Sequence, residues 1–92
     1  NIEAMVAIKL TKNTKEEVED FKNSMSLLSE VVNIYHLAGQ IDFLLYVAVK
    51  DKGHLKDFVM DHITKDYVKS LETSLIYDFS HNPLFPMYLE NE

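Results

Sequence analysis

The residues best suited to bind a small molecule lie in one short segment, residues 37–42 (Leu-Ala-Gly-Gln-Ile-Asp). Because glycine has no side chain, a charged group of a ligand can approach the backbone amides beside Gly39. The carboxylate of Asp42 can bind the α-ammonium group of an amino acid while free amides of the turn bind its carboxylate. A plain turn would use the same two residues, with positive φ at the glycine and a capping aspartate. The spacing therefore predicts either an amino-acid site or a structural turn.

The other residues with reactive side chains give weaker signals. The sequence has no cysteine, and no serine lies in a Gly-x-Ser-x-Gly motif, so neither common nucleophile is indicated. His62 falls on an apolar helical stripe, which predicts a core histidine. The histidines do not have the spacing of metal ligands, so we expect no metal site. We also expect no cofactor and no catalytic residue. These histidines are His36, His54, His62 and His81.

The turn leads into a segment, 41–49, that is apolar on both faces of the predicted strand. A strand with one face in water alternates apolar and polar side chains, and this one does not. One face can be covered by the chain's own helices, but 92 residues leave little to cover the second. We therefore expect a second copy of the chain to cover it. One face carries Phe43, Leu45, Val47 and Val49, and the other carries Leu44, Tyr46 and Ala48.

Hydrophobic periodicity predicts the elements that position this turn. Residues 2–10 alternate and form a central strand, and Thr14 to Glu17 form a capping box that begins a helix over 15–29. Asp51 caps a second helix, whose apolar stripe is Leu55, Phe58, Val59, His62 and Ile63. The other predicted strands are 31–37, 41–49 and 67–79, with Leu71, Thr73, Leu75, Tyr77 and Phe79 on one face of the last.

This order of elements predicts an α+β protein with the ferredoxin-like βαββαβ arrangement. Right-handed crossovers place both helices on one face of a four-stranded antiparallel sheet. Since the other face is apolar and bare, two sheets should pack face to face into a dimeric α+β barrel. Residues 1–80 form the domain, and 81–92 form a C-terminal arm, which Pro83 and Pro86 keep extended against a neighbour.

Charge and hydropathy exclude two kinds of partner. The net charge is −6, and all nine basic residues are lysine, so we expect no direct binding of nucleic acid. No apolar run approaches the length that spans a bilayer, and the first residues lack the pattern of a signal peptide. We expect a soluble cytoplasmic protein without membrane contact.

The turn and the last strand together resemble a known family. The pattern Gly-x-x-Asp-aromatic-Leu-Leu-x-Val begins at Gly39, and Val68 and a Thr-x-Leu motif at Thr73 follow. This resembles the effector-binding (RAM) domain of the Lrp/AsnC transcriptional regulators, without their N-terminal helix-turn-helix. Leu71 departs from the family, in which many members carry a polar residue there. The resemblance implies a homodimer that assembles further into tetramers or octamers and binds an amino acid between dimers. The residues implied are Gly39, Gln40, Ile41, Asp42 and Thr73, with His36 as a weaker candidate.

Three functions are compatible with these residues. The first is a non-catalytic domain that senses an amino acid and regulates transcription through a tethered or partner DNA-binding module. The second is a small dimeric α+β-barrel enzyme, a monooxygenase or isomerase, with its site inside one sheet and helix layer near His36 or Tyr46. The third is a structural oligomerisation module without a ligand.

Overall fold

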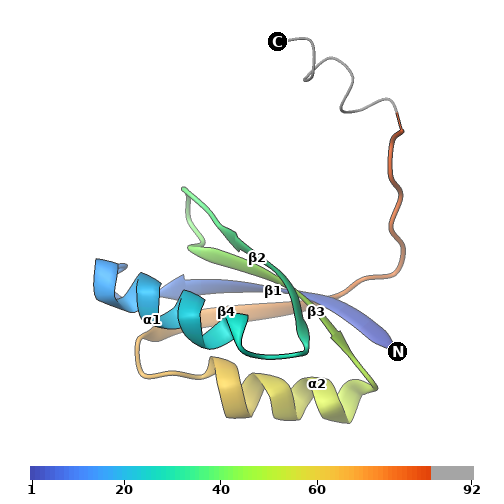
Figure 1. Ribbon diagram of the computed structural model, residues 1–92, viewed down its shortest axis with the longest axis horizontal. Coiled ribbons are helices and arrows are strands. Elements are labelled where there is room, and N and C mark those ends of the chain that lie inside the picture. Colours follow the sequence, from blue (N-terminus) through green and yellow to red (C-terminus); the bar gives the residue numbers. More distant parts are fainter. Residues whose placement is uncertain (84–92) are drawn as a thin grey trace.

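The computed structural model describes residues 1–83 and places them in one antiparallel sheet with two helices packed on one side (Figure 1). The sheet order is β2-β3-β1-β4, so β1 lies at the centre, as the sequence predicts. The predicted α+β, ferredoxin-like fold is confirmed. The elements are β1 (Ile2–Leu10), α1 (Lys15–Ser26), β2 (Val31–His36), β3 (Phe43–Val49), α2 (Lys52–Phe58), the π-helical turn η1 (Val59–Ile63) and β4 (Val68–Leu75).

The two central strands are apolar on both faces, but only one face is covered within the chain. Buried and partly exposed residues alternate from Ala4 to the end of β1 and throughout β3. The buried residues face the helices, where Phe21 and Met25 of α1 and Phe58 of α2 complete the core. The opposite face, which we call the open face, carries the partly exposed residues Met5, Ala7, Leu44, Tyr46 and Ala48. The sequence therefore predicted the two-faced strand correctly.

Both helices begin where the sequence predicts. The Thr14 hydroxyl accepts a hydrogen bond from the N–H of Glu17 at 3.2 Å, and the Asp51 carboxylate accepts one from the N–H of His54 at 2.8 Å. The reciprocal half of the predicted capping box differs. The Glu17 carboxylate accepts from the N–H groups of Lys12 and Asn13, and so it fastens the preceding turn to α1. The first helix ends at Ser26, three residues earlier than expected.

The second helix departs from its predicted register at η1. The N–H of Thr64 donates to the Val59 carbonyl, a hydrogen bond over five residues that marks a π-type turn. Such a turn holds more residues than an α turn, so the side chains that follow are rotated around the axis. Ile63 enters the core, whereas His62 is exposed and its ring lies against that of Phe58, with centroids 5.8 Å apart. The prediction that His62 is a core histidine was therefore wrong.

The last strand is shorter than predicted. It ends at Leu75, and the segment beyond it leaves the body of the molecule at the end opposite the β2–β3 turn (Figure 1). Tyr77 is 102% exposed and Phe79 is 76% exposed, so these aromatic residues do not continue the strand face as expected. Most of the predicted arm, residues 84–92, lies outside the described residues. Among residues 1–83, no helix is long and apolar enough to cross a membrane.

Candidate functional site

The β2–β3 turn is held against the central strand by Asp42. The N–H of Asp42 donates to the Ile8 carbonyl at 2.8 Å, and its side-chain Oδ2 accepts a hydrogen bond from the N–H of Leu10 at 2.7 Å. The N–H of Leu37 closes the turn by donating to the Asp42 carbonyl at 2.9 Å. Asp42 is only 4% exposed. In a single copy, this carboxylate therefore serves the fold by fastening the turn to the end of β1.

The backbone of the same turn is rich in unused donors. Within residues 1–83, the N–H groups of residues 38–41 donate no hydrogen bond. Gly39 does not have the positive φ that the sequence led us to expect. A Cβ placed on Gly39 would meet no atom within 4 Å, so neither conformation nor packing within the chain requires glycine there. The chain leaves these four amides without a partner, so they can donate hydrogen bonds to a ligand.

Lys9 adds a positive charge to this turn. It lies on the open face at the end of β1, and its Nζ donates to the Gln40 carbonyl at 3.0 Å. Sequence reasoning missed this contact, because it joins residues 31 positions apart. The pairing of Ile8 with Phe43 is the feature that brings Lys9 to the turn. This contact places a positive charge at the turn, where it can attract an anionic ligand.

His36 lies at the same end of the sheet but on the helix side. Its ring stacks on that of Phe43, with centroids 4.8 Å apart and planes 18° apart. Beside it is a hollow of 330 Å³ lined by Asn13, His36, Leu37 and Ala38. His36 is exposed and therefore accessible to a ligand in this hollow. The structure thus brings the weaker sequence candidate next to the turn residues.

Thr73 is the one predicted site residue that a single chain does not bring to the turn. It pairs with Val6 on β4, which lies two strands away from β3. It lines a groove on the helix side of the sheet, beside α2. A site that contains both Thr73 and the turn must therefore be built from two copies of the chain.

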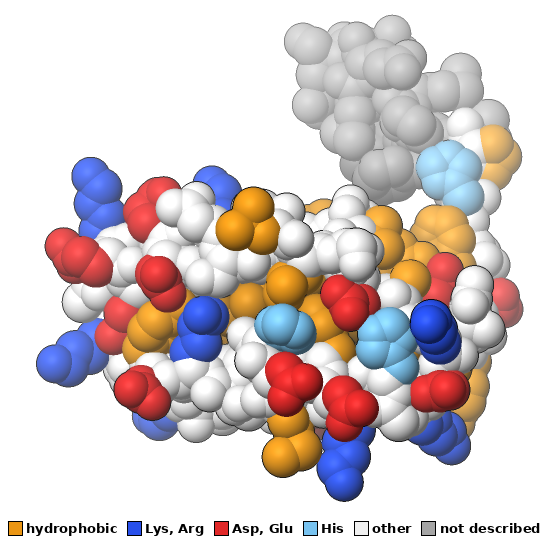
Figure 2. Space-filling view, turned by 60° about the horizontal axis from the view of Figure 1, so that its bottom comes forward, with side chains coloured by type: hydrophobic (Ala, Val, Ile, Leu, Met, Phe, Trp, Pro, Cys, Tyr) orange, Lys and Arg blue, Asp and Glu red, His pale blue; other side chains and the backbone are white. Residues whose placement is uncertain are grey.

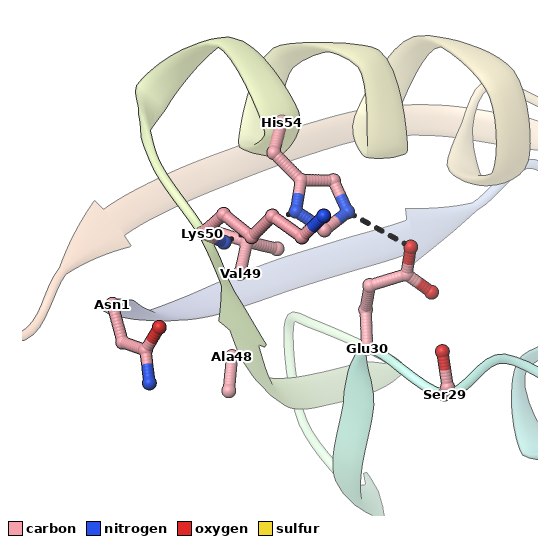
Figure 3. Close-up of a pocket in the computed structure, with 7 residues that line it drawn as sticks. All are labelled: Asn1, Ser29, Glu30, Ala48, Val49, Lys50 and His54. Atoms are coloured by element: carbon pink, nitrogen blue, oxygen red, sulfur yellow. Dashed lines mark hydrogen bonds and ion pairs between the residues drawn. The ribbon is translucent and has the colours of Figure 1, made fainter.

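A second polar site joins the start of β2 to the start of α2 (Figure 3). His54 Nδ1 accepts the N–H of Lys50 at 3.0 Å, and His54 Nε2 lies 3.0 Å from Glu30 Oε2. Because Nδ1 is an acceptor, the proton of the neutral ring is on Nε2, which donates to Glu30. This hydrogen bond from His54 holds the pKa of the Glu30 carboxyl below its usual value.

The hollow beside this pair has a volume of 190 Å³, and Ser29, Ala48 and Lys50 contribute to its lining. Sequence reasoning found neither member of the pair, because nothing local links residues 24 positions apart. Among the described residues, no group of three or more acidic or histidine side chains could hold a metal ion.

The residues suggested for an enzyme do not form one site. His36 lies on the helix side, where it stacks on Phe43, whereas Tyr46 lies on the open face. The Tyr46 hydroxyl donates to Glu3 Oε2 at 2.7 Å, which raises the pKa of Tyr46. Tyr46, Met5 and Tyr35 also line a hollow of 320 Å³ on the open face. His36 and Tyr46, the two alternatives for an enzymatic site, therefore lie on opposite faces of the sheet.

Comparison with known proteins gives the same family as the turn and the last strand. The model of the Lrp/AsnC ligand binding domain matches residues 3–80. The HTH-type transcriptional regulator AldR of Mycolicibacterium smegmatis is 32% identical over 78 residues, which cover 84% of this chain and 46% of that protein. The chain thus spans less than half of the length of that regulator.

Solved structures share the fold. The crystal structure of AldR from Mycobacterium tuberculosis has a TM-score of 0.81 at 23% identity and covers 89% of this chain and 57% of that one. A transcriptional regulator of Neisseria meningitidis, solved in complex with L-Met, has a TM-score of 0.79 at 24% identity and covers 95% of this chain and 59% of that one. At such identities these likenesses concern the fold alone.

Proposed function

The chain belongs to the Lrp/AsnC ligand-binding domain family, and we propose that it senses an amino acid at the β2–β3 turn and couples binding to self-association. The family is a ligand-binding domain of transcriptional regulators, so the role of this domain is binding and regulation, not catalysis. The observation that carries the proposal is the row of four free amides at residues 38–41 beside the Lys9 ammonium.

The proposed contacts follow from the charges of an amino acid. Its carboxylate binds the free amides of Gly39 and Gln40 and the Lys9 ammonium group, and the free amide of Ile41 remains for a second polar group of the ligand. Asp42 keeps these amides in place through its bond to the Leu10 N–H, in addition to the ligand contact that its carboxylate suggests in the sequence. The Neisseria regulator solved with L-Met supports an amino acid as the kind of ligand.

The proposed assembly follows from the open face. Its apolar centre, formed by Met5, Leu44 and Tyr46, is partly exposed in one copy, and a second copy packed face to face would bury it. Dimers associate further, so that Thr73 of one copy and the turn of another line one cleft, with His36 at its edge. Ligand in that cleft favours one assembly over another, because binding and association are thermodynamically linked.

In this proposal residues 1–80 are the sensing domain and 81–92 an arm. Regulation of transcription then depends on a tethered or partner DNA-binding module, because a chain with a net charge of −6 is poorly suited to bind DNA itself.

The test is isothermal titration calorimetry of the folded protein against each common amino acid. We expect saturable heat with one or a few of them, lost in Lys9→Gln and kept in Lys12→Gln, which removes an exposed lysine outside the turn. Circular dichroism checks that each variant folds. The absence of heat with every amino acid from a folded, associated protein would contradict the sensing role and favour a structural oligomerisation module.

A further inference from the structure

A groove between α2 and the edge strand β4 shares only Thr73 with the cleft proposed for amino-acid sensing. It has a volume of 470 Å³, within the range of small-molecule sites. Its apolar lining is Leu55, Val59, Met60 and Leu75, and two of these side chains are unusually exposed, Met60 at 60% and Leu75 at 43%. The helix side that carries it mixes charges of both signs around a band of hydrophobic side chains (Figure 2). The groove thus offers an apolar surface that the chain leaves in water.

Two lysines border this apolar surface. Lys52 and Lys56 are four residues apart on α2, so both project on the side of the helix that faces the groove. Within residues 1–83, neither lysine forms an ion pair. Two like charges at this spacing repel each other. A bound anion would relieve this repulsion.

The helix dipole of α2 acts differently on the two lysines. Lys52 is the first residue of α2, where the dipole disfavours a positive charge, although the N-cap carboxylate of Asp51 lies next to it in the chain. Lys56 lies in the last turn of α2, where the helix dipole favours a positive charge. Both lysines thus place positive charge at the mouth of the apolar groove.

The end of the groove is shaped by the π-type turn. Val59 and Met60 line the groove and are the first two residues of η1. The Thr64 hydroxyl donates to the Met60 carbonyl at 2.7 Å and stabilises this turn. Isolated π turns within helices occur often at functional sites. The long, flexible Met60 side chain can adapt to ligands of different shape.

From this geometry we propose that the α2–β4 groove binds an amphiphilic carboxylate with an aliphatic tail. The tail packs against Leu55, Val59 and Leu75, and the carboxylate lies between the Lys52 and Lys56 ammonium groups. A free amino acid fits poorly, since its α-ammonium group would be repelled by both lysines. The groove and the turn therefore select different ligands.

The test uses the full chain and octanoate as the probe, followed by calorimetry and by the amide shifts of α2 and β4 in NMR spectra. We expect saturable binding of octanoate, and much weaker binding of acetate, which lacks the tail, and of 1-octanol, which lacks the charge. The double variant Lys52→Gln/Lys56→Gln should bind octanoate at least about tenfold more weakly. The matched double variant Lys15→Gln/Lys22→Gln removes the same charge from exposed positions of α1 and should bind as the original protein does.

Three results would overturn the proposal. One is equal loss of binding in both double variants, which would mean that only net charge matters. Another is binding of 1-octanol as tight as that of octanoate, which would mean a nonspecific apolar surface. The third is a change of the association state in Met60→Gln without octanoate, which would assign the groove to a second copy. Gly39→Val should keep octanoate binding while it impairs amino-acid binding, so the two proposals can fail independently.

Discussion

The Asp42 carboxylate and the backbone N–H of Leu10 form a hydrogen bond of 2.7 Å across 32 positions of the sequence. This bond fastens the β2–β3 turn to the end of β1 and engages Oδ2 of the carboxylate that the sequence suggested for a ligand. It also changes which substitutions can test the function. Asp42→Ala cannot separate a sensing domain from a structural module, because it weakens the fold in either case.

Asp42→Ala should lower the free energy of unfolding by about 2 kcal/mol, because it leaves the Leu10 N–H without its buried acceptor. Urea denaturation at one fixed protein concentration measures this loss, since association shifts the apparent stability. Asp57→Ala, which removes an exposed carboxylate of α2, is the control and should change little. Equal stabilities of the two variants would contradict the role of Asp42 in the turn.

Gly39→Ala and Gly39→Val should leave stability unchanged to within about 0.5 kcal/mol, because no atom within 4 Å opposes a Cβ and the φ angle is not positive. Both should weaken amino-acid binding, the valine more strongly, because the new side chain obstructs the free amides. Thermal unfolding and calorimetry on the same samples separate the two effects. Undiminished binding by Gly39→Val would place the ligand elsewhere.

Leu44→Glu should disrupt self-association, because it places a charge in the centre of the open face that a second copy would bury. Leu27→Glu introduces the same charge at a side chain that is 85% exposed next to α1, away from that face, and is the control. Sedimentation velocity should show a smaller assembly for Leu44→Glu alone. If both variants sediment as the original protein does, the sheet faces are not the interface.

Tyr67 should make the protein sensitive to alkali. Its hydroxyl donates a hydrogen bond to the Asp20 carboxylate. The pKa of Tyr67 is raised above its ordinary value of 10.0, mainly because the side chain is partly buried and also because of this hydrogen bond. The unfolded chain therefore loses the phenolic proton first. The contribution to stability is complete below pH 10.0 and declines as the pH rises above it.

The control for this effect is Tyr67→Phe. This variant should be less stable at neutral pH by less than about 1 kcal/mol, because the hydrogen bond that it lacks is partly exposed. Between neutral and alkaline pH it should lose less stability than the protein with Tyr67. Urea unfolding over a pH series measures both slopes. If the free energy of unfolding changes equally with pH in both proteins, the pKa of Tyr67 does not differ between the folded and unfolded states.

The hydrogen bond between Glu30 and His54 should make the stability of the protein depend on pH in the acid range. The hydrogen bond from His54 lowers the pKa of Glu30 below its ordinary value of 4.5, so the stabilisation is present above pH 4.5 and is lost as the pH falls below it. Glu30→Gln should show a weaker loss over this range. Nitrogen chemical shifts of the His54 ring at neutral pH should show Nδ1 unprotonated and Nε2 protonated. The opposite tautomer would contradict the bond from the Lys50 N–H.

The sequence alone determined the elements, their order and the family. Alternation along β1 and β3 and the caps at Thr14 and Asp51 are local patterns, because side-chain direction repeats every two residues in a strand and helix caps lie within a few residues of the first turn. The Gly-x-x-Asp motif also located the turn, where the structure then revealed free amides.

Only the tertiary structure decided what the individual side chains do. Contacts between distant residues, such as Lys9 with the turn and His54 with Glu30, depend on strand register and on the distance between helix and sheet, which no local pattern encodes. One π-type turn was enough to move His62 from the predicted core to the surface. Thr73 and the turn lie on different strands and become neighbours only if copies associate, since strand order separates them within one chain.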